Sequence, residues 1–169
     1  TNGDAPFTAI FEGNSHIINN LYIDRQDMEY IGLFGATDGA EIRHLSLAGP
    51  LMVVKGERSV GSLAGESSNS LFLRIANSGE IFGAGNATGI GGLVGLADSS
   101  NQVIACANSG HIYGYTSVGG LVGRFGSGNQ VVGSFNVGSV NGNSSWRNGF
   151  IGGGLVGWIT SDNNHRPSW

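Results

Sequence analysis

Charged residues are scarce in this chain. They make up 12% of its 169 residues, with Lys55 as the single lysine and a formal net charge of −4. The arginines are scattered along the sequence, so no basic patch for nucleic acid or an anionic membrane surface is predicted. No uninterrupted apolar stretch approaches the roughly 18–20 residues that a membrane-spanning helix needs. We therefore expect neither nucleic-acid binding nor membrane insertion.

Paired cysteines and clustered histidines are also missing. Cys106 is the only cysteine, which excludes an intrachain disulfide. It aligns in the repeats described below with Leu45 and Ile75, so we expect a small buried core residue rather than a nucleophile. His44 and His111 fall at different repeat positions, and no histidine has a second ligand at zinc spacing. The sequence predicts no metal site and no cofactor.

Glycine, in contrast, supplies 31 residues, and it recurs in a pattern. The pentapeptide Gly-Gly-Leu-Val-Gly occurs at 91–95, 119–123 and 153–157, with looser copies at 61–65 and 32–35. The last glycines of these copies, the landmark glycines, are spaced 28 to 34 residues apart. Such a period is typical of stacked supersecondary units. Long helices are disfavoured, because a glycine inside a helix costs on the order of 1 kcal/mol relative to alanine.

Each unit contains three short extended segments, which glycine and Asn/Ser turns separate. Asparagine recurs two residues before a second periodic glycine, as Asn77, Asn108 and Asn136. Segments this short cannot form a core alone and must stack on copies of themselves. The sequence therefore predicts an all-β fold, a right-handed parallel β-solenoid (β-helix) of about five to six coils with 28–34 residues per coil. The right hand follows from the general preference of parallel crossovers.

A leucine precedes each landmark glycine by two positions. We expect these leucines to stack inside the solenoid as one buried column, the structural core ladder: Leu33, Leu63, Leu93, Leu121 and Leu155. The glycines that flank them are expected where the backbone turns a corner or needs a positive φ.

The whole chain, 1–169, is predicted to be a single solenoid domain. Residues 1–30 read as an atypical first coil, 31–157 as the repeats, and 158–169 as a tail that is too short for a complete coil. Either this tail caps the end or another domain or subunit does. Because the chain begins at Thr1 without a signal peptide, we expect a mature product or a piece of something longer.

The motifs resemble a known repeat family. Gly-Leu-Phe-Gly at 32–35 and the Gly-Gly-Leu-Val-Gly copies, each followed by Ile-x-x-Cys/Phe-x-Asn-x-Gly-x-Ile/Val-x-Gly, are similar to the GLUG-motif repeats of bacterial secreted and surface proteins. The opening Phe-x-Gly-Asn-x-x-Ile-x-x-Leu pattern, which begins at Phe11, is similar to the segment that often precedes such repeats. The resemblance covers about residues 7 to 160. It implies a secreted or cell-surface location and an adhesin-like setting, and it brings no catalytic residues.

The predicted function is a non-catalytic structural or adhesive module. Its partners would be a host or matrix surface, a glycan, or copies of itself. One alternative is a subunit of an extracellular fibre, since the open strand edges of the first and last coils can stack end to end. Another is a polysaccharide-binding or polysaccharide-active β-helix, which would need carboxylates gathered on one face. Asp24 and Asp27 form the best pair, but we expect solvated loop residues, and no catalytic residue is predicted.

The longest unit carries extra residues at 141–150. Insertions in repeat arrays map to loops, where solenoids carry recognition. Trp146, Arg147 and Phe150 are therefore a candidate ligand-binding loop, in which Trp146 and Arg147 could stack on a sugar ring or an anionic group. The alternative is that Trp146 folds back over the last coil as a cap.

Overall fold

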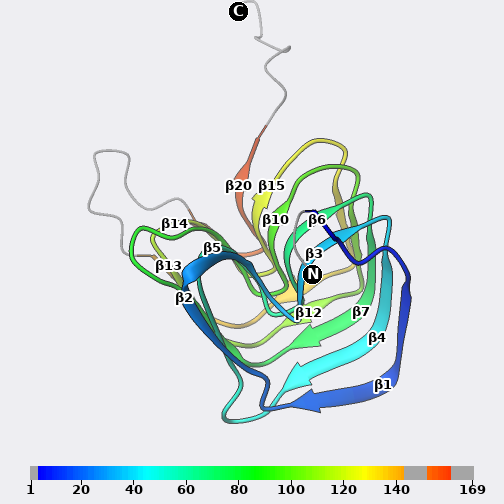
Figure 1. Cartoon of the computed structure of the whole chain (residues 1–169), viewed down its shortest axis with the longest axis horizontal. Coiled ribbons are helices and arrows are strands. Elements are labelled where there is room, and N and C mark those ends of the chain that lie inside the picture. The colour runs from blue at the N-terminus through cyan, green and yellow to red at the C-terminus, as the bar shows by residue number, and fades with distance from the viewer. Residues whose placement is uncertain (1–3, 143–151, 161–169) are drawn as a thin grey trace, which may run out of the picture.

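The computed structural model describes residues 4–142 and 152–160. Over these residues the chain is all-β, and its parallel strands stack as a solenoid of about five turns (Figure 1). This confirms the predicted fold. Within the same residues, nothing forms a helix with the length and apolar character that crossing a bilayer requires.

Three parallel sheets form the sides of the solenoid. Sheet I contains β1 (Ile10–Asn19), β4 (Glu41–Ala48), β7 (Leu71–Asn77), β11 (Gln102–Ile104), β12 (Ala107–Asn108), β16 (Gln130–Val132) and β17 (Phe135–Asn136). Sheet II contains β2 (Tyr22–Ile31), β5 (Val53–Val60), β8 (Glu80–Gly83), β9 (Thr88–Gly91), β13 (Ile112–Gly114), β14 (Thr116–Gly119), β18 (Val140–Gly142) and β19 (Gly152–Gly153). Sheet III contains β3 (Phe34–Asp38), β6 (Ala64–Ser68), β10 (Val94–Ala97), β15 (Val122–Phe125) and β20 (Val156–Ile159).

The chain passes through the three sheets in the same order in every coil, so equivalent residues of successive coils lie side by side. In sheet I, Ile42 pairs with Phe72 and Phe72 with Val103, and all three side chains are fully buried. In sheet II, Val54, Ile81 and Ile112 form a second fully buried column. Because alternate residues of a strand point to opposite faces, the neighbours of these columns face outward.

The leucines line the third side of the core. Leu63, Leu93 and Leu121 are fully buried, and each donates its backbone N–H to the carbonyl of the leucine in the next coil, at 3.0, 2.9 and 2.9 Å. Leu33 is partly buried against the core. Leu155, which accepts the bond from Leu121, is 37% exposed, because no further coil covers it among the described residues.

Two ladders of polar side chains also run through the interior. Asn77 donates from Nδ2 to Oδ1 of Asn108 at 2.7 Å, and Asn108 donates to Asn136 at 2.8 Å. In the second ladder, the Thr37 hydroxyl donates to Ser67 at 2.8 Å and the Ser67 hydroxyl donates to Asn101 at 2.7 Å. Buried polar groups need such partners, and the periodic spacing supplies them from the adjacent coil.

The landmark glycines do not take a positive φ where they were expected to. Instead, another backbone segment lies against them. A Cβ on Gly95 would be 2.3 Å from the carbonyl carbon of Ser59, and a Cβ on Gly65 would be 2.2 Å from that of Tyr30. Glycine is required there because any side chain would collide with the backbone of sheet II. Of the two expected reasons for these glycines, a corner of the backbone or a positive φ, the positive φ was wrong, whereas bends such as that at Gly92 and Leu93 do lie beside them.

Positive φ angles occur instead at other repeat positions, and most of these positions are occupied by residues other than glycine. In sheet I they recur at His44, Arg74, Ala105 and Gly133, with φ of 53°, 55°, 52° and 58°. In sheet II, Tyr30, Ser59 and Ser117 have φ of 59°, 50° and 54°. A left-handed residue bends the strand at one place in each coil, as in a β-bulge. The segments against which Gly65 and Gly95 pack are therefore the bends of sheet II.

Aromatic rings fill the interior at the amino-terminal coil. Phe34 occupies the position that Ala64, Val94 and Val122 hold in later coils. Its ring centroid lies 4.7 Å from that of Phe7 and 5.7 Å from that of Phe11. Phe7 also pairs with β3 through its backbone, since its N–H donates to Ala36 at 2.9 Å. The segment before β1 thus covers part of the first coil's open end.

Candidate functional site

One outward-facing column of sheet II combines charged and aromatic side chains. The strand register places its members one above another along the solenoid, and we name them the outer column: Asp24, Lys55, Phe82, Tyr113 and Asn141. The buried column of Val54, Ile81 and Ile112 lies one residue away on the same strands, which forces the outer column toward solvent.

The first four members of the outer column contact one another, each with the next along the solenoid. Lys55 Nζ lies 3.3 Å from Asp24 Oδ2 and 5.9 Å from the ring centroid of Phe82. The rings of Phe82 and Tyr113 are stacked, with centroids 4.6 Å apart and planes 7° from parallel. A hydrogen bond from Gln26, together with Lys55, lowers the pKa of the Asp24 carboxyl. The column is therefore held by an ion pair, a cation–π contact and a ring stack before any ligand arrives.

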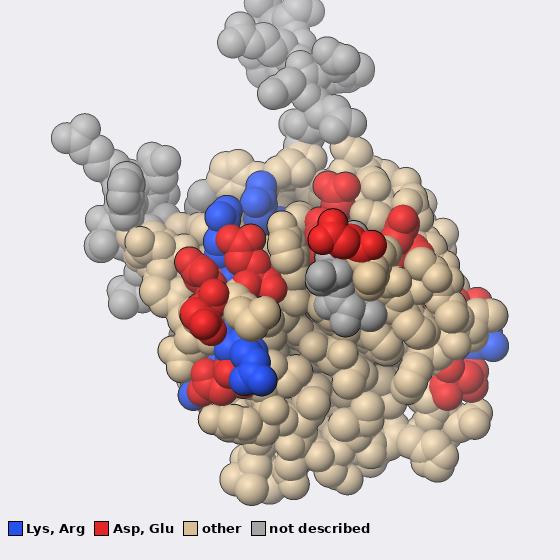
Figure 2. Space-filling view, viewed as in Figure 1, with Lys and Arg blue, Asp and Glu red and all other residues tan. Residues whose placement is uncertain are grey.

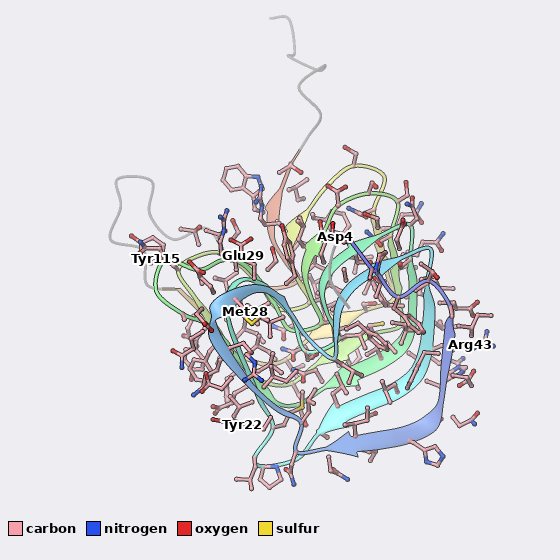
Figure 3. All side chains as sticks on the ribbon, in the orientation of Figure 1. Asp4, Tyr22, Met28, Glu29, Arg43 and Tyr115 are labelled. Carbon is pink, nitrogen blue, oxygen red and sulfur yellow. The ribbon has the colours of Figure 1, made fainter. Side chains whose placement is uncertain are left out.

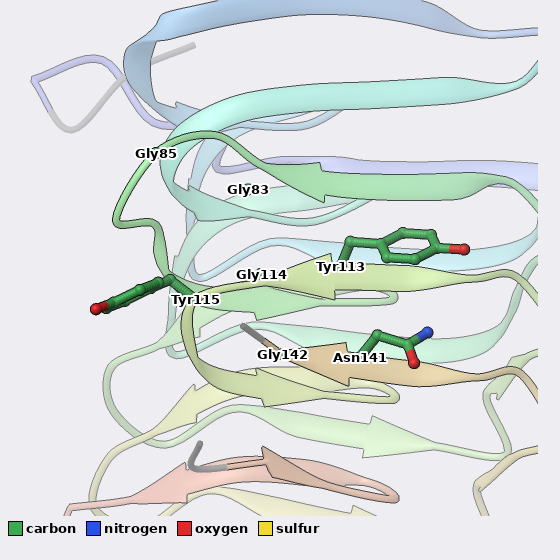
Figure 4. A pocket seen from close by; sticks show the side chains of 7 residues that line it. All are labelled: Gly83, Gly85, Tyr113, Gly114, Tyr115, Asn141 and Gly142. Carbon is green, nitrogen blue, oxygen red and sulfur yellow. The ribbon is translucent and has the colours of Figure 1, made fainter. Parts of the chain in front are cut away.

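Two adjoining hollows lie beside the outer column. The larger, about 490 Å³, is lined by four glycines with Tyr113, Tyr115 and Asn141, and we name it the tyrosine hollow (Figure 4). The other, about 350 Å³, is lined by Gln26, Lys55, Glu80 and Phe82 among others. Both are lined by Gly83, so the two hollows adjoin along successive coils.

Core packing explains the bare floor of the tyrosine hollow. A Cβ on Gly114 would point inward and lie 2.8 Å from Ile90 Cγ1 and 2.8 Å from Val118 Cγ2. The strand thus presents only backbone between the two tyrosines. Figure 4 shows the Tyr113 and Tyr115 rings leaving this floor in opposite directions, with the Asn141 amide one coil away from Tyr113.

Some of the charged side chains on the described surface are paired with opposite charges. On the coils that carry β2 and β5, Lys55 pairs with Asp24, and Arg58 Nη1 lies 3.4 Å from Glu29 Oε1. Figure 2 accordingly shows red and blue side chains interspersed around β2. Asp24 and Asp27, which we expected in a loop, both lie within β2.

A second charge cluster lies on sheet I. Arg43 Nε donates to Glu12 Oε2 at 2.6 Å, Arg43 also contacts Glu41, and His44 Nδ1 lies 3.0 Å from Glu12 Oε1. A backbone hydrogen bond from Asn14, with those from Arg43 and His44, lowers the pKa of Glu12 to about 2. Figure 3 places Arg43 on the opposite side of the molecule from Tyr115, so this cluster is separate from the tyrosine hollow.

Other titratable groups stand apart from both clusters. Partial burial and the nearby charge of Asp98 raise the pKa of Glu66. Cys106 is fully buried, its thiol donates to the Phe72 carbonyl at 3.4 Å, and burial raises its pKa to about 11. In residues 4–142 and 152–160, no three His, Cys, Asp or Glu side chains gather as metal ligands would.

The predicted loop residues Trp146, Arg147 and Phe150 lie outside the described residues. The outer column and the tyrosine hollow were not predicted. The sequence does contain a signal for the outer column, since Phe82 and Tyr113 directly follow the periodic isoleucines Ile81 and Ile112. Two aromatic residues at one outward repeat position indicate adjacent rings on the surface, provided that the register is known.

The comparisons with known proteins add one relative. Over 99 residues, which are 58% of this chain, the sequence is 33% identical to halomucin of Haloquadratum walsbyi. The chain corresponds to only 1% of the length of halomucin. No family model matches the chain, and no solved structure matches it. The resemblance to GLUG-motif repeats therefore stays a prediction.

Proposed function

We propose that this chain is a structural module of an extracellular or cell-surface protein, with outer faces that serve for attachment. The observation that carries this proposal is the continuity of the stack. The leucine backbone bonds and the asparagine ladder each link one coil to the next without interruption from Leu63 to Leu155 and from Asn77 to Asn136. Such an array is suited to holding surfaces at fixed positions along an axis.

The likeness to halomucin supports the extracellular or surface location. The low content of charged residues and the absence of a basic patch agree with a module that binds neither nucleic acid nor an anionic bilayer. The outward, half-buried rings of Phe82 and Tyr113 support an adhesive role, because aromatic side chains are enriched in surfaces that recognise other molecules.

We also infer that the module is non-catalytic. General acid–base chemistry on a polysaccharide needs two carboxyl groups placed on either side of a bond. Glu12 and Asp24 are instead held ionised by cations and hydrogen-bond donors. Partial burial and the charge of Asp98 raise the pKa of the Glu66 carboxyl, and a hydrolysis assay of a Glu66→Gln variant on polysaccharides would reveal any catalytic contribution.

End-to-end assembly is a second candidate, which the ends of the solenoid favour. Ile10 and Tyr22 of the first coil are each 63% exposed, and Ile159 of the last described strand is 69% exposed. Heterologous contacts between such ends produce open filaments. Light scattering and electron microscopy over a concentration series test this role, and a strict monomer at the highest concentration would rule it out.

The proposed location has a direct test. Antibodies raised against this chain should label the outer surface or the surrounding matrix of intact cells that produce it, as seen by immunogold electron microscopy. Pre-immune serum is the control. Labelling confined to the cytoplasm would overturn the proposal.

A further inference from the structure

We propose that the tyrosine hollow, beside Tyr113, Tyr115 and Asn141, is a binding site for an uncharged glycan chain. The inference deepens the attachment role proposed above by naming a surface and a ligand class, and it rests on that role. Its site lies wholly on described residues of β8, β13, β18 and the bends that follow β8 and β13.

The size and direction of the surface suit an oligosaccharide. The tyrosine hollow is about 490 Å³, within the range of roughly 300–1,000 Å³ typical of ligand sites. Through Gly83 it continues into the hollow of about 350 Å³ beside Lys55 and Phe82. Since strands of neighbouring coils are about 4.8 Å apart, a ligand that follows both hollows must extend along the solenoid axis. A linked chain of sugar rings meets this requirement.

The chemistry of the lining matches a sugar ring. A pyranose presents apolar C–H groups on its faces and hydroxyl groups around its edge. Tyr113 and Tyr115 offer both aromatic carbon and a hydroxyl that donates and accepts, and the Asn141 amide donates and accepts as well. Asn141 Nδ2 already donates one hydrogen bond, to Ser139 Oγ at 3.2 Å. An apolar peptide segment would leave the second Nδ2 hydrogen and the Oδ1 of Asn141 unpaired, which disfavours it as the occupant.

The charges around the site select against anionic ligands. The glycines, tyrosines and asparagine that line the tyrosine hollow carry no charge. Lys55, in the adjoining hollow, is already paired with Asp24 at 3.3 Å, and Glu80 adds a carboxylate there. A uronic-acid polymer or a phosphate backbone would meet no unpaired cation among these residues. A neutral glycan needs no such cation, so its binding is not weakened.

The site is also built before the ligand binds. Gly114 is fixed by the core behind it, as a Cβ there would be 2.8 Å from Ile90 Cγ1. Tyr113 is held by its stack on Phe82, and its strand is paired on both sides, with β8 and β18. A rigid site loses little conformational entropy when a ligand binds, which favours the binding of a carbohydrate.

Isothermal titration calorimetry of the full chain with maltohexaose, cellohexaose and chitohexaose tests the proposal, with hexagalacturonate as the charged comparator. We expect at least one neutral hexasaccharide to bind with a Kd of about 1 mM or tighter, and hexagalacturonate to bind at least about tenfold more weakly. Tyr115→Ala should weaken the neutral ligand about tenfold or more, through lost ring contact.

Two further variants separate binding from folding. Tyr113→Phe keeps the stack on Phe82 and removes one hydroxyl, so affinity should fall several-fold with an unchanged melting temperature. Phe135→Ala removes an aromatic side chain that is 56% exposed on sheet I, and it should bind as the wild type does. The inference is overturned if no neutral hexasaccharide binds, if hexagalacturonate binds equally well, or if folded Tyr115→Ala retains full affinity. Surface labelling of cells without glycan binding would overturn the site alone and leave the structural role standing.

Discussion

Asn77 donates a hydrogen bond from Nδ2 to Oδ1 of Asn108 at 2.7 Å, across one full coil. Asn108 also closes the chain turn that follows it. Its Nδ2 donates to the Gly110 carbonyl at 3.1 Å, and its Oδ1 accepts from the Gly110 N–H at 3.2 Å. One buried side chain therefore satisfies a turn and links three coils. Asn77 and Asn136 close the equivalent turns at Gly79 and Gly138 with the same pair of hydrogen bonds.

Removing the middle amide should be costly. Asn108→Ala removes the hydrogen bonds of Asn108 with Asn77, with Asn136 and with the turn at Gly110, and each buried group that loses its bond costs about 1–3 kcal/mol, so we expect a loss of about 3 kcal/mol or more. Asn136→Ala, at the half-buried end of the ladder, should cost about 1 kcal/mol. Urea unfolding measures both. Equal losses for the two variants would contradict the ladder.

Two glycines at the same motif position should respond differently to alanine. A Cβ on Gly120 would lie 2.1 Å from the carbonyl oxygen of Gly154 in the next coil, whereas nothing described lies within 4 Å of a Cβ on Gly154. We expect Gly120→Ala to destabilise the fold by about 3 kcal/mol or more, and Gly154→Ala to change stability by less than about 0.5 kcal/mol. Thermal unfolding followed by circular dichroism distinguishes them. If both variants melt alike, packing between coils is not the reason for the motif.

The bend of sheet I offers a stabilising substitution. Ala105 is exposed with φ of 52°, and Gly133 has φ of 58° at the equivalent position one coil later. A left-handed conformation costs a non-glycine residue roughly 1–2 kcal/mol, so Ala105→Gly should stabilise the protein by about 0.5 kcal/mol after the entropy of glycine in the unfolded chain is subtracted. Gly133→Ala is the reverse control, since no described atom lies within 4 Å of its added Cβ. Chemical denaturation should give shifts of opposite sign, and shifts of the same sign would refute the conformational explanation.

Acid should weaken the first two coils through Glu12. Its pKa falls from 4.5 to about 2 in the folded protein, chiefly through the Asn14 backbone and Arg43. Because the folded pKa lies below the unfolded value, the stabilisation is complete above pH 4.5 and is lost as pH falls toward 2. The melting temperature should therefore decline across this window, and Glu12→Gln should flatten that decline. An identical profile for the variant would show that other groups dominate.

Cys106 should be chemically inert while the protein is folded. The side chain is fully buried and the pKa of its thiol is raised to about 11, so little thiolate is present or accessible at pH 8. A thiol-specific chromogenic reagent should label none of it under native conditions and one equivalent in denaturant. Rapid native labelling would show that the coil around Cys106 opens.

The repeat spacing was sufficient to predict the stacking of coils. Leu63, Leu93 and Leu121 recur at one position because each must fill the same space in its own coil, so sequence periodicity reports spatial alignment directly. The flanking glycines were recognised, but their close approach to another backbone segment was not predicted. The atoms that exclude a Cβ from Gly95 belong to Ser59, which is distant in the sequence, and no local pattern reveals that approach.

In the outer column, too, the sequence encodes one part of the arrangement and the tertiary structure decides the rest. Phe82 and Tyr113 hold equivalent repeat positions, so their adjacency is encoded in the spacing of the chain, yet the parallel stack of their rings depends on side-chain packing. The tyrosine hollow required more, because Tyr115 reaches it only through the bend after β13, and Gly114 forms its floor only because Ile90 and Val118 occupy the core behind it.

By itself, the sequence determined an all-β parallel solenoid, the period of its coils and the leucines of its core, since a repeated unit can bury its apolar residues only against copies of itself. The tertiary structure alone decided where the backbone bends, which glycines are crowded and which outward residues surround a hollow. Those features arise from contacts between sheets and between coils, and such contacts are set by how three sides close around one core.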